Sequence, residues 1–256
     1  MTSAIIGLLH RDLRVAQREL KYFFLRVGLQ PLLFTFIFGY VMPRQGIIHE
    51  GYASMLLPGI LALSMTLSGM QAVALPLVID FGWTKEIEDR LLAPIAISTV
   101  ALEKILVGVI QSIIAGMVVL PLSWLVMGGG NVQLQLAHPL LLIVVALLAS
   151  WLFSAFGLAI GTIADPQQIG LVFNVLIAPM IMFGCAYYPW ATLHVVPLVQ
   201  KLVLVNPLVY ASEGFRAALT SQLPHMPLWL ILTGLIGFSA LFTTIGLRQF
   251  ERRALD

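Results

Sequence analysis

Residues 139–163 read P-L-L-L-I-V-V-A-L-L-A-S-W-L-F-S-A-F-G-L-A-I-G-T-I and contain no charged side chain. At about 1.5 Å per residue, an α-helix of this length crosses the roughly 30 Å hydrocarbon core of a bilayer. Lipid offers no partner for unpaired backbone groups, and the run lacks the alternation of a barrel strand. The stretch therefore predicts a membrane-spanning helix.

Similar apolar runs fill most of the 256-residue chain. Hydrophobic residues make up 59% of the sequence and charged residues 10%, whereas ordinary soluble domains contain about 25% charged residues. We expect an all-α membrane protein with one transmembrane domain over residues 1–256 and no separate soluble domain. The six predicted spans lie near residues 22–42, 52–79, 105–127, 139–163, 169–189 and 227–247.

The fourteen Lys and Arg residues predict the orientation, because basic loops remain on the cytoplasmic side of a membrane. With six spans, eleven of them share one side: Arg11, Arg14, Arg18, Lys21, Arg26, Lys85, Arg90, Lys104, Arg248, Arg252 and Arg253. Arg44, Lys201 and Arg216 fall on the other side. Both termini are therefore predicted to be cytoplasmic. The net charge of +2 reflects this topology and gives no reason to expect a nucleic-acid partner.

Residues 1–21 precede the first predicted span. Apolar side chains recur there at helical spacing, at Ile5, Leu9, Leu13, Ala16 and Leu20. This stripe predicts an interfacial amphipathic helix on the inner leaflet, with a solvated extension as the alternative. No small-residue cleavage site follows a short apolar stretch, which disfavours a signal peptide.

The sequence contains no pair of ionisable residues with the spacing of a catalytic or metal-binding site. The charged residues nearest the spans sit at predicted span ends, where snorkelling lowers the cost of a charge; they are Asp80, Glu103, Lys104 and Asp165. Cys185 is the single cysteine, and no two of the five histidines have the spacing of a helical metal site. We expect no catalytic residue and no metal site. The lack of buried ionisable residues also disfavours a secondary transporter or ion pump.

Residues 84–94, T-K-E-I-E-D-R-L-L-A-P, form a charged island between two long apolar runs. Thr84 can cap a helix, Glu86 and Glu88 favour its positive N-terminal end, and Ile87 with Leu91 gives one apolar ridge. In the predicted topology the island is cytoplasmic. It is therefore a candidate contact with a soluble partner, the alternative being a solvated loop helix that holds two spans together.

Four motifs occur in order along the chain: Y-A-S-M-L-L-P-G at 52–59, I-E-D-R-L-L-A-P at 87–94, P-x-x-x-F-G-x-x-Y-Y-P at 179–189 and L-V-N-P-L-V-Y-A-S-E-G-F-R at 204–216. In this order across six spans, they resemble the membrane subunit, or permease, of the ABC type-2 transporter family. That family includes bacterial drug exporters and exporters of lipid-linked glycans and lipo-oligosaccharides. The resemblance covers essentially the full length.

The resemblance implies a division of labour between polypeptides. Two permease copies, here expected to be a homodimer, form the path through the lipid, and two ABC ATPase subunits bind ATP and magnesium beneath it. This chain contains no G-x-x-x-x-G-K-[ST] phosphate loop and no Gly-Lys dipeptide. The island then corresponds to the coupling helix that docks on the ATPase, through Thr84, Glu86, Ile87, Glu88, Asp89, Arg90, Leu91 and Leu92.

Two residues depart from the family pattern. Glu103 stands where Gly is usual before Lys104, and we interpret it as tolerated through a local pair with that lysine. Arg90 stands where Leu is common and is a candidate for tuning the choice of partner. Glu88 matches the acidic position of the family and is the best single candidate for an ATPase contact.

The segment 190–226, between the fifth and sixth predicted spans, is too apolar for a solvated loop and is rich in proline. The resemblance implies short re-entrant helices that seal the outer mouth of the path, with a gate at Tyr187, Tyr188, Asn206 and Pro207. Anchoring of the aromatic residues at the membrane interface is an equal alternative for that role. Glu213 and Arg216, three residues apart, predict a local ion pair. Candidate path-lining residues are Phe38, Ser68 and Asn174.

The sequence thus favours an inner-membrane permease that exports a hydrophobic or amphipathic compound with a separate ATPase. Bacterial drug exporters make multidrug resistance one expected role, and export of a lipid-linked glycan differs only in substrate. The alternative from another class is a membrane-embedded enzyme or scaffold without an ATPase partner.

Overall fold

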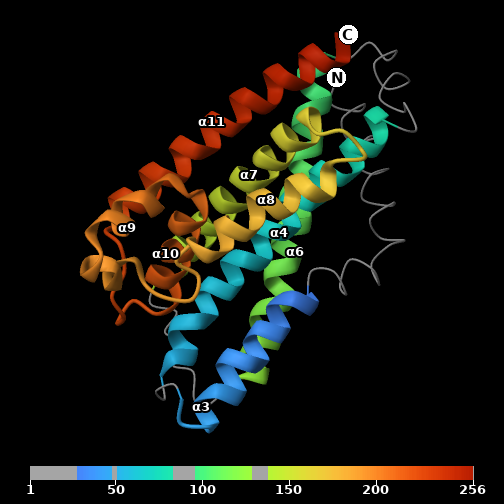
Figure 1. Ribbon diagram of the computed structural model, residues 1–256. Helices are drawn as coiled ribbons and strands as arrows, with labels where there is room; N and C mark the ends of the chain where they lie inside the picture. The colour runs from blue at the N-terminus through green and yellow to red at the C-terminus, as the bar shows by residue number, and fades with distance from the viewer. Residues whose placement is uncertain (1–27, 48–50, 83–95, 129–137, 256) are drawn as a thin grey trace.

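The computed structural model describes residues 28–47, 51–82, 96–128 and 138–255, and every regular element in these ranges is a helix (Figure 1). The predicted all-α class is therefore confirmed for the described part of the chain. The predicted N-terminal helix, residues 1–21, and the island, residues 84–94, lie outside the described residues.

Among the described residues, four helices are long and apolar enough to cross a membrane. They are α4 (Tyr52–Gly82), α6 (Ile97–Val126), α7 (Pro139–Ile163) and α11 (Leu228–Leu255). These helices correspond to the predicted spans 52–79, 105–127, 139–163 and 227–247. The bounds of α7 coincide with those of the predicted span, whereas α6 begins eight residues before its predicted span and α11 ends eight residues after its own.

The other two predicted spans are not confirmed as spans. Residues 28–34 are α-helical and continue into the π-helix η1 (Thr35–Val41) and the short α3 (Met42–Arg44). The fifth predicted span, 169–189, is shortened to α8 (Ile169–Met182), 14 residues long. At about 1.5 Å per residue, α8 covers roughly 21 Å, which is short of the hydrocarbon thickness.

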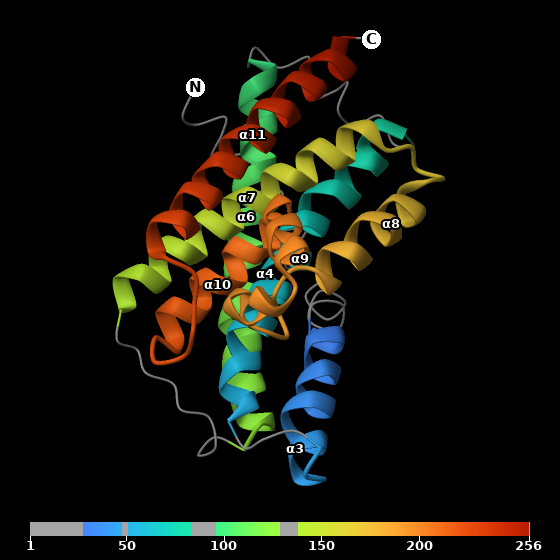
Figure 2. The same ribbon diagram turned by 60° about the vertical axis from the view of Figure 1, so that its left-hand side comes forward.

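Helix α4 lies at the centre of the molecule, between α6 and α7 (Figures 1 and 2). In the most apolar 18-residue stretch of α4, 78% of the residues are buried, compared with 22% in that of α11. Helix α11 packs along the outside of α7. Small residues permit the close contact between α4 and α7, because a Cβ at Gly157 would overlap the backbone of Met70. A shift of α4 must therefore displace its neighbours.

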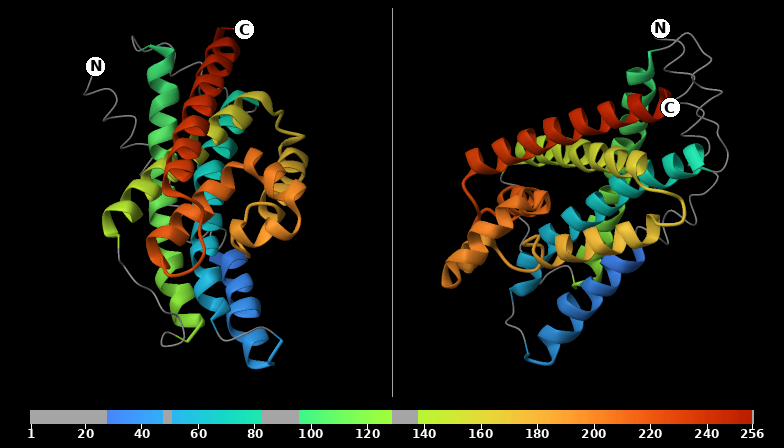
Figure 3. Two further views of the ribbon diagram at one scale, coloured as in Figure 1. Left: turned by 90° about the vertical axis from the view of Figure 1, so that its left-hand side faces the viewer. Right: turned by 45° about the horizontal axis from the view of Figure 1, so that its top comes forward.

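The helices alternate in direction, and one end of the bundle carries most of the described charge. At this charged end, α4 ends near the start of α6, and α7 ends near the end of α11 (Figures 1 and 3). We define the charged end by the side chains of Asp80, Glu103, Lys104 and Arg253. Arg44, Lys201 and Arg216 belong to elements away from it, in α3, α9 and α10.

Between α8 and α11 the chain forms a set of short helices, which we call the cap, residues 183–226. It comprises η3 (Trp190–Val195), α9 (Pro197–Leu202), η4 (Val203–Val205) and α10 (Pro207–Leu219). The prediction of short helices within 190–226 is confirmed. Every residue of α10 is buried, because α4, α7 and α11 surround it.

Candidate functional site: the cap and the charged end

Helix α10 owes its position to its first two residues. The Asn206 side chain accepts a hydrogen bond from the backbone N–H of Leu208 at 3.0 Å, and Pro207 follows it at the first helical position. Both residue types favour a helix start. The Asn206 amide also donates to the carbonyl of Met180 in α8 at 2.8 Å. Of these two predicted gate residues, Pro207 begins α10 and Asn206 connects this helix start to the end of α8.

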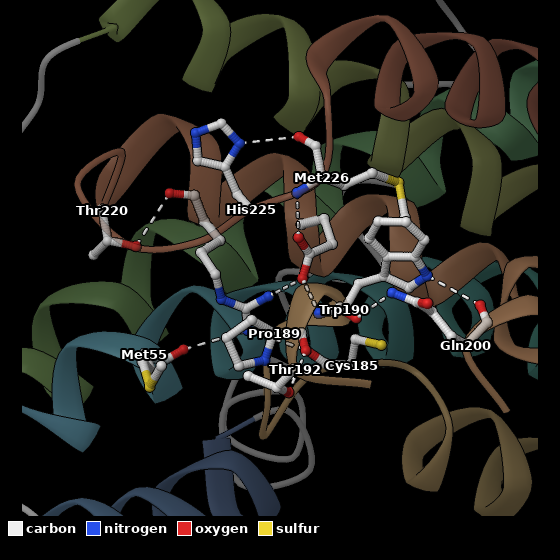
Figure 4. A network of polar contacts seen from close by, with 11 residues as sticks. Met55, Cys185, Pro189, Trp190, Thr192, Gln200, Thr220, His225 and Met226 are labelled. Carbon is white, nitrogen blue, oxygen red and sulfur yellow. Dashed lines mark hydrogen bonds and ion pairs between the residues drawn. The ribbon is translucent and has the colours of Figure 1, made fainter. Parts of the chain in front are cut away.

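The predicted ion pair between Glu213 and Arg216 is confirmed, and both side chains are fully buried in α10. The carboxylate of Glu213 accepts three hydrogen bonds. One comes from Nη1 of Arg216, one from the backbone N–H of Trp190 at 2.8 Å, and one from the backbone N–H of Met226 at 2.7 Å. Figure 4 shows Trp190 and Met226 converging on this carboxylate from two sides. Glu213 therefore holds the start of η3 and the last residue of the cap to α10.

Arg216 extends the same network to the rest of the bundle. Its Nη2 atom donates to the carbonyl of Cys185 at 3.0 Å and to the carbonyl of Met55 in α4 at 3.4 Å (Figure 4). Its own carbonyl accepts from the hydroxyl of Thr220 at 3.1 Å. Because a buried charge requires such partners, this pair fixes the first turn of α4, the turn after α8 and α10 in one arrangement.

The turn between α8 and η3 lies directly against the start of α4. The hydroxyl of Tyr52 donates to the carbonyl of Tyr187 at 2.9 Å. A Cβ on Gly59 would overlap the carbonyl oxygen of Ala186. Cys185 has a φ of 52°, in the left-handed region that few residues other than glycine adopt. The cap thus touches α4 through backbone atoms, which leaves little room for independent movement.

The aromatic gate candidates have different surroundings. The ring of Tyr187 lies 5.4 Å from that of Phe34 and 6.0 Å from that of Phe38, between centroids. Its hydroxyl is buried without a hydrogen-bond partner among the described residues. The hydroxyl of Tyr188 instead donates to the carbonyl of Met182 at 3.0 Å. Tyr187 therefore joins the first helix to the cap, whereas Tyr188 closes the turn after α8.

The three path candidates lie in three different environments. Phe38 is half-buried beside Tyr187. Ser68 is 2% exposed and donates to the carbonyl of Gln111 at 3.2 Å, within the contact of α4 with α6. Asn174 is exposed on α8, and its amide donates to the carbonyl of Gly170 at 2.9 Å. The structure does not bring these three residues together within the chain.

The charged end contains a pair that the sequence analysis missed. Lys104 Nζ lies 3.5 Å from Asp80 Oδ2, joining α6 to α4. Glu103 and Lys104 were expected at a span end, but α6 begins at Ile97 and places them almost two turns inside the helix. They are 1% and 5% exposed. The sequence feature that could have predicted their burial is the apolar stretch before Lys104, which is consistent with a helix that begins earlier.

No group of three or more His, Cys, Asp or Glu side chains that could hold a metal occurs within residues 28–47, 51–82, 96–128 and 138–255. The docking candidates at 84–94 lie outside the described residues, so their role stays a prediction.

The long apolar helices and the helical cap define a multi-pass α-helical membrane protein. Residues 3–220 match the family described as ABC-2 type transporter, and the chain belongs to this family. It is thus a membrane permease, the transport subunit of such a system, and permeases of this family typically pair with nucleotide-binding subunits. A comparison with curated proteins found no match.

Proposed function

We propose that this permease works in an ATP-driven exporter that moves a hydrophobic or amphipathic compound outward across the inner membrane. Drug-like molecules, lipids and lipid-linked glycans are the substrate classes that fit its apolar bundle. The family match carries this proposal. Because the sequence has no phosphate loop, ATP and magnesium belong on a separate ABC ATPase subunit.

The contact with that ATPase is the island, residues 84–94. The island directly follows α4, which ends at Gly82, and precedes α6, which begins at Ile97. Both helix ends belong to the charged end, where Asp80 and Lys104 connect them. A displacement of the island would therefore be transmitted to α4 and α6 together. The positive-inside rule supports the assignment of this end, and of both termini, to the cytoplasm.

Transport follows from a change between two arrangements of the bundle. ATP binding closes two ATPase subunits, the islands of two permease copies move with them, and α4 carries the displacement toward its other end. There Tyr52, Met55 and Gly59 contact the cap. The cap, as a re-entrant segment at the outer mouth, opens in response. Phe38 and Asn174, which are accessible in the single chain, line the path in the dimer, whereas Ser68 lines it only in an arrangement in which α4 separates from α6.

Co-purification from the native host tests the proposal. The tagged chain is expected to retain a phosphate-loop ATPase, and Glu88→Arg or Leu91→Asp is expected to release it. Glu251→Arg is the matched control, because Glu251 is an exposed acidic residue at the end of α11. This control should retain the ATPase, with membrane abundance equal to that of the wild type.

Two results would count against the proposal. If the wild type retains no ATPase, the permease lacks its energy source and the enzyme or scaffold alternative leads. If the ATPase remains with both island variants, docking takes place elsewhere on the chain.

A further inference from the structure

Arg253, near the end of α11, contacts two other helices at the charged end. Its Nη1 atom donates to the carbonyl of Thr162 at 2.6 Å and to the carbonyl of Ala164 at 3.2 Å. Its guanidinium carbon lies 4.9 Å from the centre of the Phe81 ring, in the last turn of α4. One side chain thus connects the ends of α4, α7 and α11.

The contacts with α7 are the stronger part of this arrangement. The last carbonyls of a helix have no partner within it, and a cation at that end also favours the helix dipole. Arg253 satisfies two such carbonyls, around the point where α7 ends at Ile163 and the chain becomes extended at Ala164. Its Nη2 atom also lies 4.0 Å from Asp165, but that carboxylate is 68% exposed. Solvent screens such a pair, so the carbonyl contacts hold the guanidinium.

The contacts with α4 come from both faces of its last turn. The ring of Phe81 meets the fully buried ring of Phe250 edge-on, with centroids 5.6 Å apart. A Cβ on Gly82 would overlap Pro166, in the turn that leads from α7 to α8. The end of α4 therefore lies against α11 on one side and against the α7–α8 turn on the other.

We propose that Arg253 is a positioning residue that joins the ends of α4, α7 and α11 so that they move together when α4 is displaced. Residues 228–255 lie beyond the matched family segment, which ends at residue 220. Through the final turn of α11, this helix would take part in coupling in addition to crossing the membrane. The cause of the displacement, nucleotide binding by an ATPase, rests on the proposed function. The connection that Arg253 makes between the three helix ends, which we call the joint, does not rest on it.

Hydrogen exchange measured by mass spectrometry on the full chain in lipid nanodiscs tests the joint. Arg253→Gln removes the charge and is expected to speed exchange at least about tenfold near the end of α7 and to increase it near the end of α4, the effect of losing charged hydrogen bonds. Arg253→Lys keeps the charge and should show a smaller increase. Arg252→Gln is the matched control, since Arg252 is exposed one residue away. Equal exchange in Arg253→Gln and Arg252→Gln would overturn the proposal.

A second arm uses the complex with the co-purified ATPase, with and without ATP, magnesium and vanadate. In the wild type, the nucleotide-dependent change in exchange should occur at the ends of α4, α7 and α11. In Arg253→Gln it should persist at α4 and fall to less than half at α7 and α11, with partial rescue by Arg253→Lys. Unchanged responses at all three ends would reduce Arg253 to a structural contact and refute the coupling role. If the wild type binds no ATPase, the proposed function fails, and the first arm still decides whether the joint exists.

Discussion

Replacing Glu213 by Gln should destabilise the protein strongly, although the two side chains have nearly the same shape. The carboxylate accepts hydrogen bonds from Arg216, Trp190 and Met226. An amide has one acceptor oxygen and a donor group where the second oxygen was. At least one of the three donors must then lose its acceptor or face another donor.

The size of the effect follows from burial. Both side chains of the pair are 0% exposed, so the guanidinium of Arg216 would remain in the protein interior without its counter-charge. Breaking a buried pair from one side costs about 3–5 kcal/mol of unfolding free energy. For a domain of this size, about 2–4 °C per kcal/mol gives a fall in melting temperature of roughly 6–20 °C.

Thermal unfolding of purified protein in nanodiscs measures this effect. Glu251→Gln, at an exposed site on α11, is the control for loss of one carboxylate. The double variant Glu213→Gln with Arg216→Met removes both charges, and its cost should be smaller than the sum of the single costs by about 0.5–3 kcal/mol. The reasoning is refuted if Glu213→Gln and Glu251→Gln have the same melting temperature. It is also refuted if the effects of Glu213→Gln and Arg216→Met on the unfolding free energy are additive.

Two further substitutions test contacts of α4. Gly59→Ala should lower the melting temperature by several degrees, because the new methyl group overlaps the carbonyl of Ala186, whereas Gly237→Ala, in open space on α11, should not lower it. Asp80→Asn should cost at least about 1 kcal/mol by removing the carboxylate beside buried Lys104. Adding Lys104→Met should recover part of that loss, and a double variant no more stable than Asp80→Asn would contradict the pair's importance.

Helix bounds agree with the expected spans where the sequence carries its own boundary signals. Pro139 begins α7, and Ile163 precedes the polar turn, so both bounds could be predicted. Helix α6 was predicted too short because Lys104 was interpreted as a boundary. Its partner, Asp80, belongs to another helix, and single-sequence periodicity does not show such a partner. Helix α11 likewise extends past Arg248 because Phe250 is buried against the ends of other helices.

The candidate site was predicted in outline only. The spacing of Glu213 and Arg216 was sufficient to predict their pair, since side chains three residues apart on a helix are neighbours. The remaining partners are backbone groups of Met55, Cys185, Trp190 and Met226, from other segments of the chain. Backbone atoms carry no residue-specific signal, so only the fold could identify them.

The position of Cys185 has a practical consequence for spectroscopy. This single thiol is completely buried, and the backbone carbonyl of the same residue accepts the hydrogen bond from Arg216. Reporter groups can therefore be attached to cysteines introduced on exposed surfaces without first replacing the native one. In the unaltered chain, a maleimide gains access to Cys185 only when the core cluster around this residue opens. The rate of that modification would time the opening of the core around the cap with no engineered probe.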